Sequence, residues 1–194
     1  MQFISSDTNV WIDFVTIHRT EIPFRLPYTY IMSQDAIDDE LLSPQGLGQE
    51  LLSYGLLPVA ITIDEFLLAE QYGNKYIKLS IYDRIALAIA KTRQITLLTG
   101  DGELRKAAKL ENVPILGTLG ILDQLLNQQC ITTDEYKICL QKLLKNNVGK
   151  PAGGNALDSS SKKKAAANSI KSATAPFNYK NIFASIKFVL LGKG

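Results

Sequence analysis

The hydrophobic pattern of the chain is dominated by one helical segment that is apolar on nearly all sides. Residues 81–90 read IYDRIALAIA, and a helix without a polar face is normally buried all round. The apolar run ITLL at 95–98 follows as a short β-strand, and the turn residues TGDG at 99–102 end it. This block predicts a buried helix followed by a buried strand at the centre of the fold.

Short apolar strands alternate with helices along the rest of the chain. Further strands are expected around Phe3 and Ile4 and at 28–32, 57–62 and 114–116. Helices are expected at 8–15, 34–42, 49–53, 63–72, 102–111 and 119–127, and a last helix begins after Thr132 or Thr133. The segment 17–29, which contains two prolines, is expected to be a loop. The alternation predicts an α/β fold in three layers (α/β/α) with a short parallel sheet in the middle.

The composition changes after Asn147. Residues 148–176 are rich in glycine, serine, alanine and lysine, which is typical of a flexible linker, so the globular domain is expected to occupy residues 1–147. An apolar segment follows at 177–194. It is interpreted either as a tail without a role in the fold or as a segment that docks on its own domain or on a neighbouring copy.

Charge and rare residues narrow the possible chemistry. The net charge of +2 does not indicate a strong nucleic-acid binder, although a local basic patch is compatible with it. Cys130 and Cys139 lack metal-ligand spacing and are expected to be reduced in a cytoplasmic protein. His18 is the only histidine, which argues against a zinc site or a Ser-His-Asp triad. No secretion signal and no apolar run of about 18 residues is visible, so no membrane association is expected.

Acidic residues lie where the predicted strands end. Asp7 follows the first strand, Asp101 follows the strand at 95–98, and Asp83 opens the buried helix. Sites in parallel sheets form at the carboxyl ends of the strands, where Asp7 and Asp101 are expected. Glu40 in the run Asp38-Asp39-Glu40 is a fourth candidate, and either aspartate before it is an alternative.

Each acid also has a simpler interpretation. Asp7 and Asp101 stand where helix N-caps stand, Ser80 and Asp83 have the spacing of a capping box, and Glu40 belongs to a run typical of a solvated face. Several carboxylates on one crowded rim, however, repel one another unless a divalent cation neutralises them. Oxygen ligands without histidine or cysteine favour Mg²⁺ or Mn²⁺, which also bind substrate phosphate. The pattern therefore predicts metal-assisted hydrolysis of a phosphodiester.

Four motifs in order resemble those of the PIN domain family, which includes VapC-like toxin ribonucleases. They are SDTNVWIDF, DDELL, LSIYDRIALAIA and LLTGDGELRKAA, and the resemblance continues through VPILGTLGILDQLL to about residue 145. The resemblance implies a metal-dependent endoribonuclease, and many members of the family are toxins paired with an antitoxin. By position it implies that Mg²⁺ or Mn²⁺ is bound by four acids, namely Asp7, Glu40, Asp83 and Asp101. It also implies polar support from three neighbours, Asn9, Ser80 and Thr99, of which the last two would hold Asp83 and Asp101.

The expected function is RNA hydrolysis by a water molecule that a bound metal activates, because no general base is evident. Arg84, Arg105 and Lys106 are candidates for contacts with RNA phosphates, unless they form only a solvated face. An antitoxin protein and a second copy of the chain are the expected partners. The alternative is a PIN-fold module that binds a protein and does not cut. A Rossmann-type nucleotide site in the turn at 99–102 is disfavoured, because the third glycine of its motif is missing.

Overall fold

The computed structural model describes residues 2–147 of the 194-residue chain. The segments predicted as a linker (148–176) and as an apolar tail (177–194) lie outside the described residues, so the domain boundary at 147 stays a prediction. Residues 2–144 belong to one compact unit. None of the helices in residues 2–147 has both the length and the apolar character that a membrane span requires.

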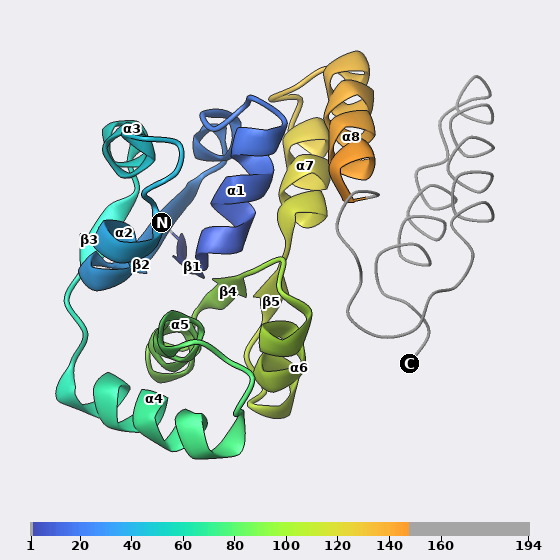
Figure 1. The fold of residues 1–194 in the computed structure, drawn as a ribbon. Helices are drawn as coiled ribbons and strands as arrows, with labels where there is room; N and C mark the ends of the chain where they lie inside the picture. The colour runs from blue at the N-terminus through green and yellow to red at the C-terminus, as the bar shows by residue number, and fades with distance from the viewer. Residues whose placement is uncertain (1, 148–194) are drawn as a thin grey trace. The chain divides into compact units, whose positions relative to one another are not determined.

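A parallel sheet of five short strands forms the middle of this unit (Figure 1). The strands are β1 (Gln2–Ser6), β2 (Tyr28–Ser33), β3 (Leu57–Val59), β4 (Thr96–Leu98) and β5 (Ile115–Leu116). Their order is β3-β2-β1-β4-β5, and every neighbouring pair is parallel. The direction of chain progress reverses between β1 and β4, which is where such sheets leave a crevice at their carboxyl ends.

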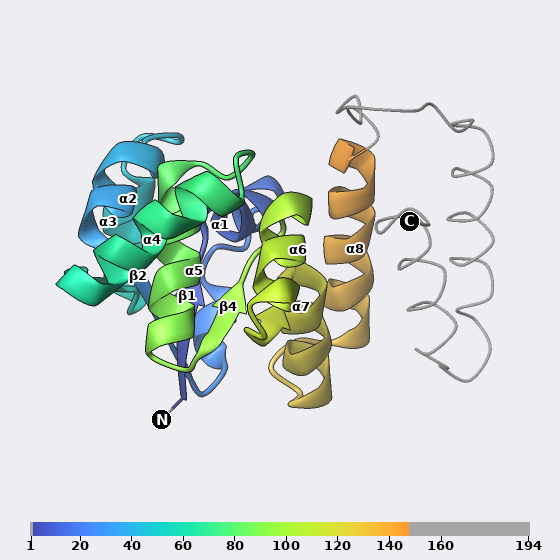
Figure 2. The same ribbon diagram turned by 90° about the horizontal axis from the view of Figure 1, so that it is seen from below.

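Helices cover both faces of the sheet, so the expected three-layer α/β/α architecture is confirmed (Figures 1 and 2). One face carries α1 (Thr8–Thr16), α3 (Leu47–Tyr54) and α7 (Thr118–Asn127), and α8 (Thr133–Asn147) lies beside α7. The other face carries α4 (Ile63–Lys75), α5 (Ile81–Thr92) and α6 (Gly102–Leu110). Helix α2 (Gln34–Glu40) follows directly on β2. In Figure 2, β1 runs upward from the N-terminus, so the carboxyl ends of the strands lie toward the top of that view.

Helix α5 is the central element, as its apolar sequence predicts. The six consecutive residues 85–90 are all buried, and they belong to a hydrophobic cluster with α4, β4 and α6. The Ser5 hydroxyl on β1 donates a hydrogen bond of 3.0 Å to the carbonyl of Ala86, which fixes α5 against the sheet. The first turn of α5 is thereby held at the carboxyl end of β1.

An aromatic cluster fills the opposite face. Trp11 of α1 stacks on Phe24 at 5.4 Å between ring centroids and meets Tyr30 of β2 edge-on at 5.4 Å. Phe24 belongs to a 3₁₀ helix, η1 (Ile22–Arg25), within the segment expected to be a loop. Pro23 stands in the first turn of η1, where a missing N–H does no harm. The loop prediction was therefore incomplete, because burial of Ile22 and Pro23 and the stacking of Phe24 on Trp11 order this segment.

Several element boundaries differ from those expected. Strand β3 ends at Val59 rather than at 62, because its neighbour β2 ends at Ser33, which is the residue paired with Val59. Helix α4 continues to Lys75 across Gly73, a position where a side chain would collide with the Arg84 guanidinium. Helix α2 ends at Glu40 and not at 42.

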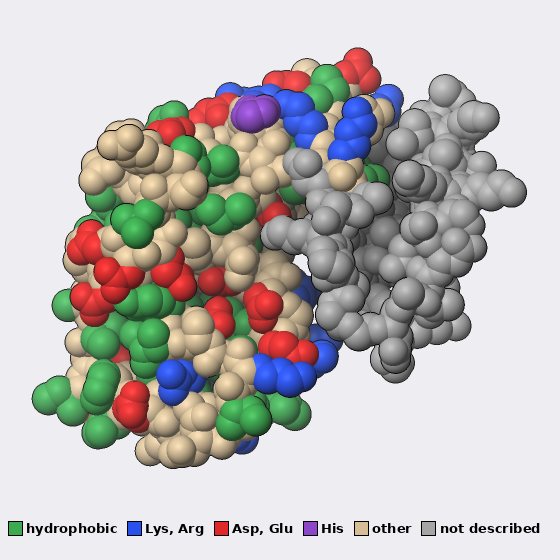
Figure 3. Space-filling view, in the orientation of Figure 1, with side chains coloured by type: hydrophobic (Ala, Val, Ile, Leu, Met, Phe, Trp, Pro, Cys, Tyr) green, Lys and Arg blue, Asp and Glu red, His purple; other side chains and the backbone are tan. Residues whose placement is uncertain are grey.

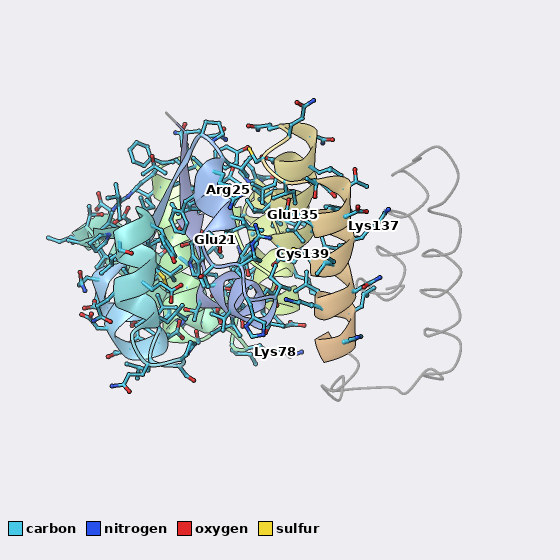
Figure 4. The ribbon with its side chains drawn as sticks, turned by 90° about the horizontal axis from the view of Figure 1, so that it is seen from above. Glu21, Arg25, Lys78, Glu135, Lys137 and Cys139 are labelled. Atoms are coloured by element: carbon cyan, nitrogen blue, oxygen red, sulfur yellow. The ribbon has the colours of Figure 1, made fainter. Side chains whose placement is uncertain are left out.

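An ion pair joins the segment 17–29 to α8, and two further pairs lie within the segment; Figure 4 labels Glu21, Arg25 and Glu135 among these residues. Arg19 pairs with Glu21 at 2.8 Å and with Glu135 of α8 at 3.1 Å, and Arg25 approaches Glu21 at 3.6 Å. These side chains are all partly exposed, so each pair adds little stability. Cys139 on the same helix is buried and, like Cys130, is free.

A buried carboxylate fastens α4 to the end of α5. Glu65 is 1% exposed, closes a capping box with Thr62, and accepts hydrogen bonds from Nε and Nη2 of Arg93 at 2.6 and 3.0 Å. We expect Glu65→Ala to lower the free energy of unfolding by about 3 kcal/mol, since it removes both the cap and the partner of Arg93. Urea unfolding measures this change, with the exposed Glu70→Ala on the same helix as control. A loss for Glu65→Ala no larger than for the control would contradict the assignment.

Candidate functional site

Asp7 lies at the centre of the candidate site, directly after β1. Its backbone amide bonds to the carbonyl of Leu98 at 2.9 Å, which places it between the ends of β1 and β4. The side chain is 5% exposed, and its Oδ2 accepts hydrogen bonds from the Thr99 hydroxyl at 2.7 Å and from Asn9 Nδ2 at 3.3 Å. Burial raises the pKa of Asp7 to about 6, and the nearby charges of Asp83 and Glu40 add to the increase.

Thr99 supports the site in a different way from the one expected. Its hydroxyl donates to the carboxylate of Asp7 and accepts a hydrogen bond of 3.0 Å from the backbone amide of Asp101. It therefore fixes the Asp7 carboxylate and the start of the turn into α6, rather than the Asp101 carboxylate. The reason is the sheet order, because β4 lies next to β1 and the end of β4 faces Asp7.

Glu40 is the acid of the 38–40 run that reaches the site. It is half-buried, accepts a hydrogen bond of 2.5 Å from the Thr8 hydroxyl, and lines a cleft together with Asp7. Burial raises the pKa of Glu40, and the charges of Asp83 and Asp39 act in the same direction.

The two aspartates before Glu40 are used elsewhere. Asp38 accepts a hydrogen bond from Gln34 at 2.8 Å on the exposed side of α2. Asp39 is also exposed and accepts a hydrogen bond from the Tyr82 hydroxyl of α5. Neither lines the cleft.

The cleft itself lies at the carboxyl ends of β1 and β2. Its volume is about 240 Å³, including space that is open to solvent, and residues of β1, β2, α1, α2 and α5 line it. Its polar lining comes from the ends of β1 and β2 and the start of α1, and includes Ser6, Thr8 and Ser33 beside the two acids. Apolar side chains such as Ala86 and Ile89 of α5 form the rest of the wall.

Asp83 and Asp101 both cap helices, as their simpler interpretation predicts. Asp83 Oδ2 accepts a hydrogen bond of 2.8 Å from the Ser80 amide, and the Ser80 hydroxyl accepts one of 3.0 Å from the Asp83 amide. Asp101 Oδ1 accepts a hydrogen bond of 2.7 Å from the Leu104 amide. Burial raises the pKa of Asp83 and the charge of Asp101 adds to this, whereas Arg84 opposes it.

The hydrogen bonds of the four acids leave one oxygen of each carboxylate available. Asp7, Asp83, Asp101 and Glu40 each use one oxygen in the hydrogen bonds above. Within residues 2–147 their other oxygens have no hydrogen-bond partner, although all four carboxylates are partly or wholly buried. A helix cap and a metal ligand are therefore compatible roles for the same side chain.

The four acids are coupled by charge, but they do not form a finished metal site. Asp83 raises the pKa of Asp7 and of Glu40, and Asp101 raises that of Asp83. In the described part of the chain, no group of three His, Cys, Asp or Glu side chains is placed to hold one ion. The donor set nevertheless fits a hard divalent cation, because it consists of carboxylate oxygens whose mutual repulsion such an ion would relieve.

Acidic side chains gather in a band across the middle of the face seen in Figure 3, with basic side chains mostly at its margins. This is the face toward which the carboxyl ends of the strands point. The supporting residue that sequence reasoning missed here is Thr8. No local signal links it to Glu40, since 32 positions separate them and only the pairing of β1 with β2 brings them together.

The comparison with protein families agrees with this geometry. A family model described as a PIN domain matches residues 3–149, which is more than half of the chain. The chain belongs to the PIN domain family. Members of this family are generally nucleases. The match includes the proline-containing segment 17–29 of this PIN domain. No curated protein and no solved structure matched the chain.

The raised pKa of Asp7 predicts how stability depends on pH. The native state holds the Asp7 proton more tightly than the unfolded state, so this stabilising contribution is complete below pH 3.8 and is lost as the pH rises through about 6. Asp7→Asn removes the free-energy cost of ionising this side chain in the folded state. Without divalent metal we expect the variant to be more stable than the wild type at pH 8, by up to about 3 kcal/mol, and equally stable near pH 3.5.

Thermal or urea unfolding in EDTA at the two pH values measures this difference. A variant that is less stable than the wild type at pH 8 would show that the Asp7 carboxylate is satisfied by the protein alone. That outcome would contradict the electrostatic account of the site.

Proposed function

We propose that this PIN domain is an Mg²⁺- or Mn²⁺-dependent endoribonuclease that hydrolyses RNA phosphodiester bonds. The observation that carries the proposal is the set of four coupled carboxylates at the carboxyl end of the sheet. Burial raises the pKa of three of them, Asp7, Glu40 and Asp83, and each of the four has one oxygen without a partner in the described residues. The family resemblance supports RNA as the substrate.

Each residue of the site would have a distinct role. Asp7, Glu40, Asp83 and Asp101 would hold the cation through their unpaired oxygens. Thr99 and Asn9 orient the carboxylate of Asp7, Thr8 orients that of Glu40, and Ser80 orients that of Asp83. When bound, a divalent cation lowers the pKa of a coordinated water molecule and stabilises negative charge on the reacting phosphate.

A second function is also tested because of one specific observation. Within residues 2–147, the acids do not form a group of three side chains that could hold one ion. This favours a PIN-fold module that binds a protein partner without cutting. Calorimetric titration with Mn²⁺ separates the two functions, because a pure binding module would have no Mn²⁺ site.

Substitution of single acids tests the nuclease proposal. We expect Asp83→Asn and Glu40→Gln each to reduce Mn²⁺-dependent cleavage of a single-stranded RNA by about 100-fold or more, since each removes a ligand charge while keeping the shape of the side chain. EDTA should abolish cleavage by the wild type. Gel analysis of a labelled RNA oligonucleotide measures the rates, with the matching DNA as comparison.

Asp38→Asn is the matched control, because Asp38 lies on the same helix as Glu40 and its side chain bonds only to Gln34 among the described residues. The control should cleave at the rate of the wild type. Unchanged cleavage by Asp83→Asn, or equal losses in all three variants, would refute the assignment of the acids.

The proposal extends to a role as the toxin of a toxin–antitoxin pair, with an antitoxin protein as partner and a homodimer as the assembly. The family resemblance is the support for this part. Growth arrest on expression of the wild type and not of Asp83→Asn would favour the toxin role.

A further inference from the structure

Arg105 occupies a defined position beside the acidic site. It lies one turn into α6 after Asp101, and its side chain turns back toward the start of the helix, as helical side chains do. Nη1 donates a hydrogen bond of 3.2 Å to the carbonyl of Thr99 at the end of β4. A Cβ atom added at Gly117, which follows β5, would lie 2.8 Å from the same Nη1. The guanidinium therefore covers the carboxyl ends of β4 and β5.

This position continues the line of acids along the edge of the sheet. Glu40 ends the helix after β2, Asp7 follows β1, and Asp101 follows Thr99 at the end of β4. The strand order places β5, and Arg105 with it, next in that row. Neighbouring strands are roughly 4.8 Å apart, so the positive charge lies close to the acids without being placed among them.

The other two basic candidates have different surroundings. Lys106 pairs with Glu103 at 2.8 Å on the exposed side of α6. Arg84 donates to the carbonyl of Ser80 at 3.1 Å, lies against Gly73 of α4, and partly offsets the charge of Asp83. Arg105 is half-buried, and among the described residues no carboxylate oxygen lies within ion-pair distance of it.

An oriented guanidinium without an acidic partner is suited to phosphate. The carbonyl of Thr99 accepts from one of the five N–H donors of Arg105. A pair of N–H donors in the plane of the guanidinium remains for the two oxygens of a phosphodiester. The neighbouring acids repel a polyanion until a cation binds, so RNA needs a positive anchor outside the acidic cluster. The contacts with Thr99 and Gly117 hold that anchor in place before RNA arrives.

We propose that Arg105 binds an RNA backbone phosphate next to the phosphodiester that is cut. This inference rests on the proposed nuclease function and adds the residue that positions its substrate.

The test compares four variants of the full chain in Mn²⁺-dependent cleavage of a single-stranded RNA oligonucleotide at several salt concentrations. We expect Arg105→Ala to raise KM about tenfold, to leave kcat within about threefold, and to reduce the salt slope of log KM by about 0.7, the share of one phosphate contact. Arg105→Lys should raise KM less than Arg105→Ala does, because lysine keeps the positive charge but lacks the paired N–H donors of the guanidinium. Lys106→Ala should behave as the wild type.

Gly117→Ala displaces the guanidinium without removing its charge, and the backbone at Gly117 is compatible with alanine. We expect a severalfold rise in KM, and this variant keeps the test decisive if Arg105→Ala folds poorly. The Mn²⁺ affinity of each variant, measured by calorimetry, should equal that of the wild type.

Two results would overturn the inference while the nuclease function stands. One is wild-type KM and salt slope in both Arg105→Ala and Gly117→Ala. The other is a loss of Mn²⁺ affinity and kcat with an unchanged salt slope, which would make Arg105 a support for Thr99 and Asp7. A wild type that binds no Mn²⁺ or cuts no RNA would instead refute the proposed function, and this inference with it.

Discussion

Mutual repulsion among partly buried carboxylates is the constraint around which this end of the molecule is organised. The parallel sheet brings Asp7 and Asp101 to one edge, and α5, fixed by the bond from Ser5 to Ala86, adds Asp83. Burial alone already opposes the ionisation of Asp7 and Asp83, the charge of Asp101 raises the pKa of Asp83, and that of Asp83 raises the pKa of Asp7. A protein that keeps such a group has either to protonate it or to bind a cation there.

The same side chains stabilise the fold and form the site. Asp83 and Asp101 begin α5 and α6 with one oxygen each and leave the other oxygen unpaired in the described part of the chain. Capping thus orients a carboxylate at low cost, because a helix start fixes both the backbone and the side chain. This dual use explains how the acids are held in place before a cation binds, and why cap-like sequence signals do not argue against a functional role.

Sequence patterns predicted what depends on neighbouring residues, and missed what depends on which strands pair. The buried face of α5, the capping box at Ser80, and the acids at strand ends all follow from local spacing. The bond from Thr99 to Asp7 spans 92 positions and exists because β4 pairs with β1. The end of β3 likewise depends on pairing, because β2 ends at Ser33, the partner of Val59. The sequence offered the adjacent Arg105 and Lys106 as equal candidates for a phosphate contact, and their contacts in the structure separate them.

Proton release on metal binding tests the central claim most directly. Calorimetric titration of Mn²⁺ at pH 6, repeated in buffers of different ionisation enthalpy, counts the protons that leave the protein. If carboxylates with raised pKa values share the site, Mn²⁺ binding should release protons at pH 6 and release few at pH 8, and Asp7→Asn should reduce the release. Binding without proton release at pH 6, or no binding at either pH, would contradict the account.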